Sequence, residues 1–264
     1  MNSDNDLVLL SIDQGIARIR FNRPGALNAI NASLARQWRE AARHVGTRAD
    51  VRVVVLAGEG RAFMAGGDLQ AFHADPSRAG ATARDIIDPL NDGLAALAEG
   101  DAPVIASVHG AVAGAGMSIA LGADLVIASE DAKFNMAYAL IGASLDAGGS
   151  WFLPRIVGLQ RAMAIALLSE PLSAAKALEE GLVHRVAAAD RLAAETDVLA
   201  RRLAEGPTGA YGRIRRLLRE GLQRNLADQL RAERDAFVQG AGMPEFGEGV
   251  DAFLNKRAPV YLGR

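Results

Sequence analysis

The chain has no cysteine among its 264 residues. This absence excludes disulfide bonds, thiolate nucleophiles and zinc sites with cysteine ligands. Histidine is also scarce: the four histidines stand at positions 44, 73, 109 and 184, with no pair at the spacing that places two metal ligands on one helix face. The sequence therefore predicts no metal site.

A large excess of charge of one sign is lacking as well. The formal net charge is −2, which gives no general electrostatic attraction to nucleic acid. The first six residues, Met-Asn-Ser-Asp-Asn-Asp, are acidic and polar, unlike a secretory signal. Half of the residues are hydrophobic, enough for a sizeable core. We therefore expect a cytoplasmic enzyme or binding protein, with no nucleic-acid or membrane partner.

One stretch, residues 102–123, carries no charge if His109 is neutral, and its length invites comparison with a membrane span. It is rich in glycine and alanine, its apolar run begins at Pro103, and it stands alone in the chain. We instead interpret residues 103–108 as a buried strand that leads into a glycine-rich turn and a short helix.

The turn between this strand and helix spans Gly110 to Ser118, and its glycines let the backbone bend sharply and approach another segment closely. The first N–H groups of a helix have no partner within the helix and can hold a negative oxygen. Our hypothesis is that the Ala115 N–H does this, together with a second N–H from the glycine-rich turn near Gly67. The alternative is a dinucleotide-binding loop, although Ile119 occupies its third glycine position.

The first two-thirds of the chain alternate strand and helix patterns, which argues for an α/β fold. Strands are expected over residues 7–12, 15–21, 51–57, 103–108, 124–129 and 183–186. Helices are expected from an N-cap at Asn31 or Ser33 to Val45, and over 86–97, 150–157, 160–168 and 174–180. Residues 70–84 show no period, because Asp75-Pro-Ser and Gly80 interrupt it, and this pattern predicts a mobile segment.

The last third predicts helices alone, over 190–205, 208–222, 225–239 and 246–256. We therefore divide the chain into an α/β core at residues 1–189 and a helical region at 190–264. Four arginines of this region, at positions 213, 215, 216 and 219, are interpreted as a solvated helix face, with contact to phosphate as the alternative.

Five segments, in their order along the chain, resemble the crotonase family of CoA-thioester enzymes, the enoyl-CoA hydratases and isomerases. They are Arg20–Ala29 (RFNRPGALNA), Ala62–Leu69 (AFMAGGDL), Gly110–Leu121 with the following Ala123-Asp124, Leu153–Gly158 (LPRIVG) and Val250–Arg257 (VDAFLNKR). The resemblance implies a crotonase-like spiral of β-β-α units, followed by a C-terminal helical region that assembles homo-trimers or dimers of trimers.

The resemblance also implies where an acyl-CoA substrate binds. The oxyanion hole falls on the N–H groups of Gly67 and Ala115, where two donors in a dry site stabilise the enolate of a thioester. The CoA moiety falls on a further set of residues: Arg23, Ala26, Leu27, Ala65, Asp68, Leu69 and Ala113, with Lys256 of the same or an adjacent subunit near the phosphates. Coenzyme A is part of the substrate, and no cofactor is expected.

Structural roles for the same residues stay open at this point. Small residues at 65–67 and 113–116 also suit the tight packing of a helix on a strand. Asp68 is a favoured N-cap residue for the helix that follows it. Lys256 is equally well a solvated charge near the end of the chain.

Hydratases of the family use two glutamates for acid–base catalysis. The matching positions in this chain hold Ser118 and Tyr138, so a different residue must serve here. A hydroxyl is no substitute for a carboxylate base near neutral pH without a large pKa shift. Asp146 stands where isomerases of the family, and a dehalogenase, place their working carboxylate. Its surroundings resemble those of the 1,2-epoxyphenylacetyl-CoA isomerases and the Δ3,Δ2-enoyl-CoA isomerases.

The sequence therefore predicts an acyl-CoA isomerase that shifts a double bond, or isomerises a ring epoxide, with Asp146 as a single proton shuttle. An apolar pocket is expected to raise the pKa of Asp146, with Tyr138 as one wall. The residues expected to build that pocket are Phe72, Ile141 and Leu145. The structural alternative for Asp146 is the N-cap of the 150–157 helix. The functional alternatives are an enoyl-CoA hydratase and a non-catalytic acyl-CoA-binding protein.

Overall fold

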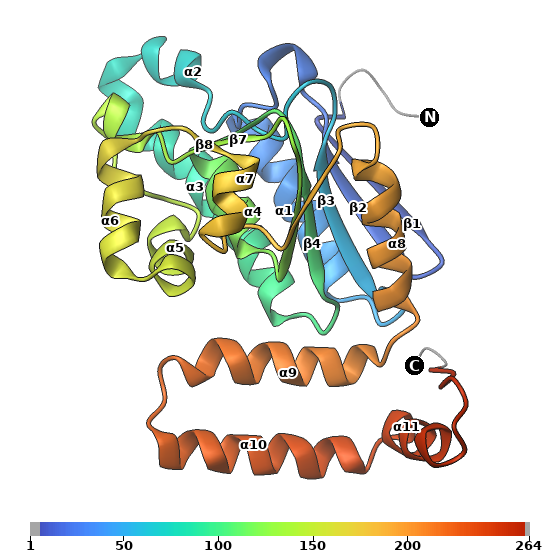
Figure 1. Cartoon of the computed structure of the whole chain (residues 1–264). Coiled ribbons are helices and arrows are strands. Elements are labelled where there is room, and N and C mark those ends of the chain that lie inside the picture. Colours follow the sequence, from blue (N-terminus) through green and yellow to red (C-terminus); the bar gives the residue numbers. More distant parts are fainter. Residues whose placement is uncertain (1–5, 262–264) are drawn as a thin grey trace.

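The computed structural model describes residues 6–261, so the first five residues of the acidic and polar start of the sequence lie outside the described range. Its centre is a six-stranded sheet (Figure 1). In sheet order the strands are β1 (Val8–Asp13), β2 (Ile16–Phe21), β3 (Val53–Gly58), β4 (Val104–Val108), β6 (Leu125–Ser129) and β9 (Arg185–Ala187). β1 and β2 form the expected antiparallel hairpin, and the other neighbours pair in parallel.

The valine-rich strand β3 is buried on both of its faces. Val53 and Val55 pack with Ile105 in one hydrophobic cluster, while Val54 and Leu56 belong to the cluster on the other side of the sheet. Successive side chains of a strand point to opposite faces, so a run without polar residues needs a cover on each side. The predicted buried parallel strand is confirmed.

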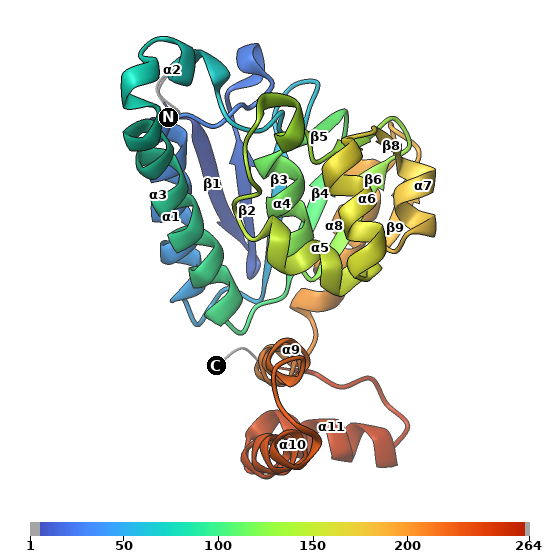
Figure 2. The ribbon, with the colours of Figure 1, turned by 90° about the vertical axis from the view of Figure 1, so that its left-hand side faces the viewer.

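Helices provide these two covers. α1 (Ala32–Gly46) and α3 (Ala79–Glu99) lie side by side over one face, and α8 (Leu192–Ala204) covers the other (Figures 1 and 2). The Asn31 side chain caps α1, as predicted, by accepting the Leu34 N–H. Between α1 and α3 the fully buried Trp38 donates its indole N–H to the Leu90 carbonyl at 3.1 Å.

The predicted division at residue 190 assigns α8 to the C-terminal helical region, but α8 packs against the large sheet. Its residues Leu192, Ala200 and Ala204 are buried against strands β2, β3, β4 and β6. By its contacts α8 is part of the α/β core rather than of the helical region that follows. The core therefore extends past the expected boundary to about the end of this helix.

A second, three-stranded sheet contains β5 (Ala111–Ala113), β7 (Lys133–Asn135) and β8 (Leu172–Ser173). The chain passes twice from the large sheet to the small one and then into a helix. The two passages are β4–β5–α4, with α4 at Ala115–Gly122, and β6–β7–α5, with α5 at Gly149–Val157. This order is the repeated β-β-α unit that the family resemblance predicts.

The segment after β3 differs from its prediction, because most of residues 70–84 are helical. α2 (Leu69–His73) and a 3-10 turn (Pro76–Arg78) lead directly into α3. Asp75 begins that turn: its Oδ1 accepts the Ser77 N–H at 3.1 Å. The Asp-Pro-Ser sequence thus starts a helix instead of interrupting one, which is a common use of these residues.

The uncharged stretch 102–123 is divided among β4, β5 and α4. Within the part of the chain that is described, no helix has the length and apolar character needed to cross a membrane. The other short elements are the 3-10 turns Pro24–Ala26 and Tyr138–Ile141, α6 (Leu159–Leu168) and α7 (Ala174–Glu179).

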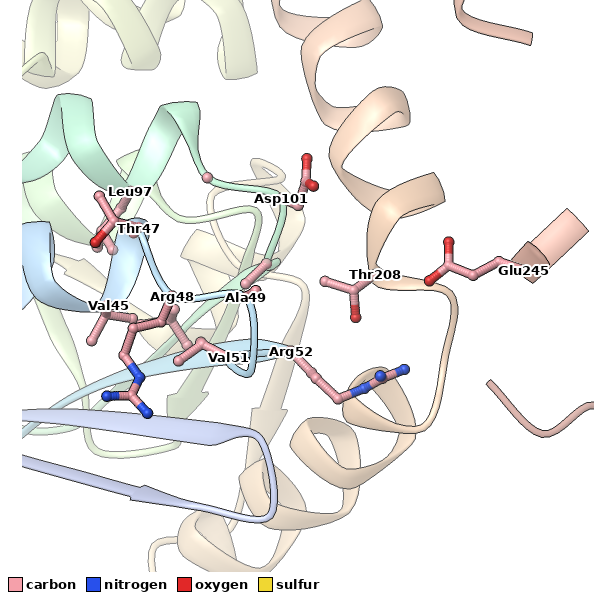
Figure 3. A pocket seen from close by; sticks show the side chains of 14 residues that line it. Val45, Thr47, Arg48, Ala49, Val51, Arg52, Leu97, Asp101, Thr208 and Glu245 are labelled. Carbon is pink, nitrogen blue, oxygen red and sulfur yellow. The ribbon is translucent and has the colours of Figure 1, made fainter. Parts of the chain in front are cut away.

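The last three helices form an arm that projects from the core (Figures 1 and 2). They are α9 (Thr208–Gly221), α10 (Leu226–Ala241) and α11 (Pro244–Leu254). Figure 3 shows a small cavity at the seam, lined by Arg52 and Asp101 of the core and by Thr208 and Glu245 of the arm. Arg52 reaches the link between α8 and α9, where it donates to the Gly206 carbonyl at 2.6 Å.

Two arginines of α9 fix the arm to the core, and the interpretation of a solvated face was wrong for Arg215 and Arg219. Arg215 is only 7% exposed, and its Nε lies 2.7 Å from Asp124 Oδ2. Arg219 pairs with the other carboxylate oxygen of Asp124 at 2.9 Å. Arg215 also donates to the carbonyls of Leu97 and Gly100 at the end of α3. The side chains of Arg215 and Arg219 therefore bind a carboxylate and backbone carbonyls. They form neither a solvated face nor a contact with phosphate.

Replacing Arg215→Ala is expected to destabilise the protein by on the order of 3 kcal/mol, because it removes a buried guanidinium and leaves the half-buried Asp124 carboxylate and two carbonyls with fewer partners. Urea unfolding measures the change. Arg216→Ala is the matched control, since its ion pair with Asp101 is partly exposed and is worth about 0–1 kcal/mol. Equal losses for the two variants would contradict the assignment of Arg215 as the anchor.

Candidate active site

Two glycine-rich turns from distant parts of the chain meet beside the small sheet. The segment after β3 runs parallel to β5, with a bridge between Met64 and Val112. The Met64 carbonyl accepts the Ala113 N–H at 2.9 Å. Beyond this pairing, a Cβ atom on Gly114 would lie 3.4 Å from the Gly66 Cα. Both glycines adopt positive φ angles, 95° at Gly66 and 51° at Gly114, a conformation that glycine adopts without strain.

Each turn leaves one backbone N–H free at this junction. Ile30 donates to the Gly66 carbonyl, and Asp68 donates to the Ile30 carbonyl, so the intervening Gly67 N–H points away from that pairing. Ala115 is the first residue of α4, where a helix has no internal acceptor for the N–H group. Within residues 6–261, neither the Gly67 N–H nor the Ala115 N–H has a hydrogen-bond partner.

Both residues line a cavity of about 760 Å³. Its walls are mostly apolar and come from α2, α3 and the 3-10 turn at residues 138–141. Side chains of these walls are Leu69, Phe72, Ile86, Ile87 and Ile141. Among the described lining residues Asp146 supplies the one carboxylate, and His73 supplies an imidazole. The cavity therefore combines free backbone donors, one carboxylate and an apolar interior.

A chain of hydrogen bonds holds the Asp146 side chain. The Tyr138 hydroxyl donates to Asp146 Oδ1 at 2.5 Å. The Ser118 hydroxyl oxygen lies 3.2 Å from the Tyr138 oxygen. Ser118 comes from α4, Tyr138 from a 3-10 turn and Asp146 from the loop before α5, so three separate elements converge on this group.

The environment shifts the pKa values of the tyrosine and the aspartate in the same direction. Burial disfavours the charged form of each group and raises the pKa of both. The Asp146 carboxylate raises the pKa of Tyr138 further. The hydrogen bond from Tyr138 acts in the opposite sense on Asp146, because it stabilises the carboxylate and lowers its pKa. A carboxylate with a raised pKa is suited to taking up and releasing a proton near neutral pH.

Comparison with known proteins identifies the family of the chain that forms this cavity. A family model for enoyl-CoA hydratase/isomerase matches residues 11–264. The chain belongs to the enoyl-CoA hydratase/isomerase family, the crotonases.

Individual relatives of this crotonase carry different activities in their names. The 1,2-epoxyphenylacetyl-CoA isomerase of Escherichia coli (strain K12) is 38% identical over 263 residues, covering 98% of this chain and 99% of that protein. A Rhodobacter capsulatus protein assigned as an enoyl-CoA hydratase is 38% identical over 253 residues, 96% of each chain. A Thermobifida fusca protein assigned as an enoyl-CoA hydratase, solved with acetoacetyl-CoA, superposes with a TM-score of 0.82 at 31% identity, covering 89% of this chain and 94% of that one.

The alternative that Asp146 is a helix cap is wrong. α5 begins after Gly148, and no side chain accepts a hydrogen bond at that N-terminus. Asp146 contributes only its backbone carbonyl there, which accepts the Gly149 N–H at 2.8 Å. Of the expected pocket residues, Phe72 and Ile141 line the cavity, whereas Leu145 packs against the hydrophobic core.

The predicted CoA residues fall into two groups. Ala65 and Leu69 line the cavity. Arg23 and Asp68 form an ion pair at 2.7 Å beside it, and Asp68 also caps α2 by accepting the Gln70 N–H. The structural and the predicted binding roles of Asp68 are thus compatible.

The remaining predicted residues lie outside the set that lines the cavity. Ala26 ends the first 3-10 turn and Leu27 follows it with a φ of 51°. Ala113 ends β5 and pairs with Met64. Lys256 follows α11, at the opposite end of the molecule from α2 (Figure 1). Contact of Lys256 with CoA therefore remains a prediction that requires a neighbouring subunit.

Sequence reasoning assigned no role to Asn28, which organises the segment Arg20–Ala29. It is fully buried, and its side-chain amide donates to the carbonyls of Glu59, Ala62 and Phe63. Its Oδ1 accepts the Arg23 N–H at 2.8 Å. Asn28 thereby ties the loop before α1 to the start of the Gly67 turn. The only signal in the sequence was an asparagine within a turn-rich loop.

Replacing Gly116→Ala is expected to lower kcat/KM for an enoyl-CoA substrate on the order of 100-fold, because small displacements of catalytic groups have effects of this size. The new Cβ would lie 2.6 Å from the Met64 carbonyl oxygen, which forces α4 away from the Gly67 turn. Gly80→Ala is the control, since its Cβ would have no atom within 4 Å. Equal steady-state kinetics for both variants, measured well below their melting temperatures, would contradict the need for this close approach.

Proposed function

We propose that this crotonase is an acyl-CoA isomerase that moves a carbon–carbon double bond, or isomerises a ring epoxide, through an enolate. The observation that carries the proposal is the single carboxylate of Asp146 in a cavity that also holds two free amides. By the family resemblance, the glutamate positions of the hydratases are occupied by Ser118 and Tyr138. Both of these hydroxyl groups belong to the hydrogen-bond chain that ends on Asp146.

The free N–H groups of Gly67 and Ala115 suit the developing charge of the enolate. Removing a proton beside a thioester carbonyl places negative charge on the carbonyl oxygen. Two donors that are already oriented in a water-poor cavity stabilise that oxygen, with roughly 3 kcal/mol of barrier reduction for each donor. Small residues in both turns let the thioester reach the backbone itself.

Asp146 then moves one proton. Its carboxylate removes a proton from the α carbon, and the electron pair delocalises over the carbonyl oxygen and the neighbouring double bond. The protonated Asp146 returns the proton to the γ carbon, the double bond moves into conjugation, and the carboxylate is restored. The reverse reaction begins at the γ carbon. Atoms and electrons balance within the substrate and Asp146, as general acid–base catalysis by one group requires.

The CoA portion is proposed to lie along Arg23, Ala26 and Leu27, and then past Asp68 and Leu69 into the cavity. The acetoacetyl-CoA in the Thermobifida fusca relative supports an acyl-CoA thioester as the ligand. Lys256 is proposed to reach the phosphates from an adjacent subunit of a trimer or a dimer of trimers.

An enoyl-CoA hydratase is the second candidate, favoured by the name of the Rhodobacter capsulatus relative. In that case Asp146 activates a water molecule. Incubation with a panel of enoyl-CoA thioesters in deuterated water separates the two reactions. Deuterium at the α or γ carbon with no gain of water marks an isomerase, whereas a 3-hydroxyacyl-CoA product marks a hydratase.

Replacing Asp146→Asn is expected to reduce double-bond migration by about 10²- to 10⁴-fold, because the amide cannot accept the proton. Ionising the buried Asp146 costs stability as the pH rises through its raised pKa, a cost that asparagine does not have. The variant should therefore melt at the same temperature as the parent or higher at neutral pH. Asp85→Asn, on the exposed side of α3, is the control for activity. Retained migration in Asp146→Asn would disprove the shuttle.

A further inference from the structure

The order of donors in the hydrogen-bond chain follows from the number of protons it contains. Tyr138 has one hydroxyl proton, and it donates that proton to Asp146 Oδ1. The contact between Ser118 and Tyr138 must then be donated by the serine. Ser118 is fully buried, and Tyr138 is 6% exposed. The chain therefore runs in one direction, from Ser118 through Tyr138 to the carboxylate.

The surrounding backbone fixes the geometry of this chain. A Cβ atom at Gly149 would lie 2.5 Å from the Ser118 hydroxyl oxygen, so α5 approaches the serine as closely as only glycine permits. Ala137 and Ala147, which directly flank Tyr138 and Asp146, both adopt positive φ angles, 52° and 48°. Such angles are uncommon for alanine and persist where the surrounding structure holds them. Both partners of the short hydrogen bond thus stand beside strained backbone.

We infer that Tyr138 is a positioning residue for the isomerisation: its hydroxyl, oriented by Ser118, holds Oδ1 of Asp146 so that Oδ2 alone carries the proton between the two substrate carbons. The inference rests on the proposed function. Within residues 6–261, Oδ2 of Asp146 has no hydrogen-bond partner, whereas Oδ1 accepts the tyrosine proton. A carboxylate held through one oxygen cannot rotate freely, and its other oxygen keeps one direction toward the substrate.

The groups around Asp146 predict how its pKa changes when the Tyr138 hydroxyl is removed. They are Tyr138 from the 3-10 turn, with Ser118 of α4 behind it, and His73 of α2 across the same cavity. Of the residues that the structure describes, only Tyr138 donates to the carboxylate. Loss of its hydroxyl removes a donor that stabilises the ionised form, so the pKa of Asp146 must rise.

The test is Tyr138→Phe, which removes the hydroxyl and keeps the ring. A hydrogen bond to a charged group is worth about 10- to 100-fold, so kcat for isomerisation should fall by about that factor, with KM within about threefold. The acidic limb of the plot of kcat/KM against pH should move to higher pH, because the base must be ionised. Ser118→Ala should give a smaller change in the same direction. Tyr211→Phe, on α9 and outside the cavity lining, is the matched control.

A second measurement needs no turnover. Carbon-13 NMR of the protein labelled at the aspartate carboxyl carbon follows the titration of Asp146, which the spectrum of Asp146→Asn identifies. The midpoint should move to higher pH in Tyr138→Phe and stay in place in Tyr211→Phe. An unmoved midpoint together with an unmoved pH profile overturns the positioning role. Retained activity in Asp146→Asn overturns the proposed function instead, and the titration distinguishes that outcome from failure of this inference.

Discussion

The structure depends on one close contact between backbones, in which the Gly67 turn approaches the turn at Gly114. The pairing of Met64 with β5 brings the two turns together, and the small size of Gly114 and Gly116 lets them touch. A Cβ atom at Gly116 would lie 2.6 Å from the Met64 carbonyl oxygen and would separate them, whereas at Gly114 the positive φ angle of 51° disfavours a side chain. The contact leaves two N–H groups without partners at one edge of a cavity. The proposed chemistry uses that edge to stabilise the enolate oxygen while Asp146 moves the proton.

The cavity also explains why a carboxylate in it must be held. Burying an ionised group away from water is unfavourable unless other groups donate hydrogen bonds to it. Asp146 receives one such bond from Tyr138, and its side chain belongs to a residue that lines the cavity. Burial raises the pKa of Asp146 above its ordinary value, and the hydrogen bond from Tyr138 opposes part of that rise. In the proposed mechanism Tyr138, which stands at a glutamate position of the hydratases, supports the base instead of acting as one.

Asp124 shows how a motif residue can be structural. It lies within the segment that resembles the family, yet its carboxylate accepts the Val104 N–H and pairs with Arg215 and Arg219 of α9. This cluster joins the sheet to the helical arm at the end of the molecule away from α2 (Figure 1). The arm's exposed apolar residues, such as Phe253 at 83% exposure, are therefore presented from a fixed position.

The sequence by itself determined the elements whose signals are local. The buried strand β3 follows from its unbroken valines, the start of α1 from Asn31, and the family from motifs in a fixed order. Only the tertiary structure decided what depends on partners far along the chain. Local pattern could not show that Asp75 starts a helix, that α8 covers the sheet, or that Arg215 is buried against Asp124. It also could not show that Asp146 bonds to Tyr138 instead of capping α5, since a carboxylate suits both roles and only the fold places its neighbours.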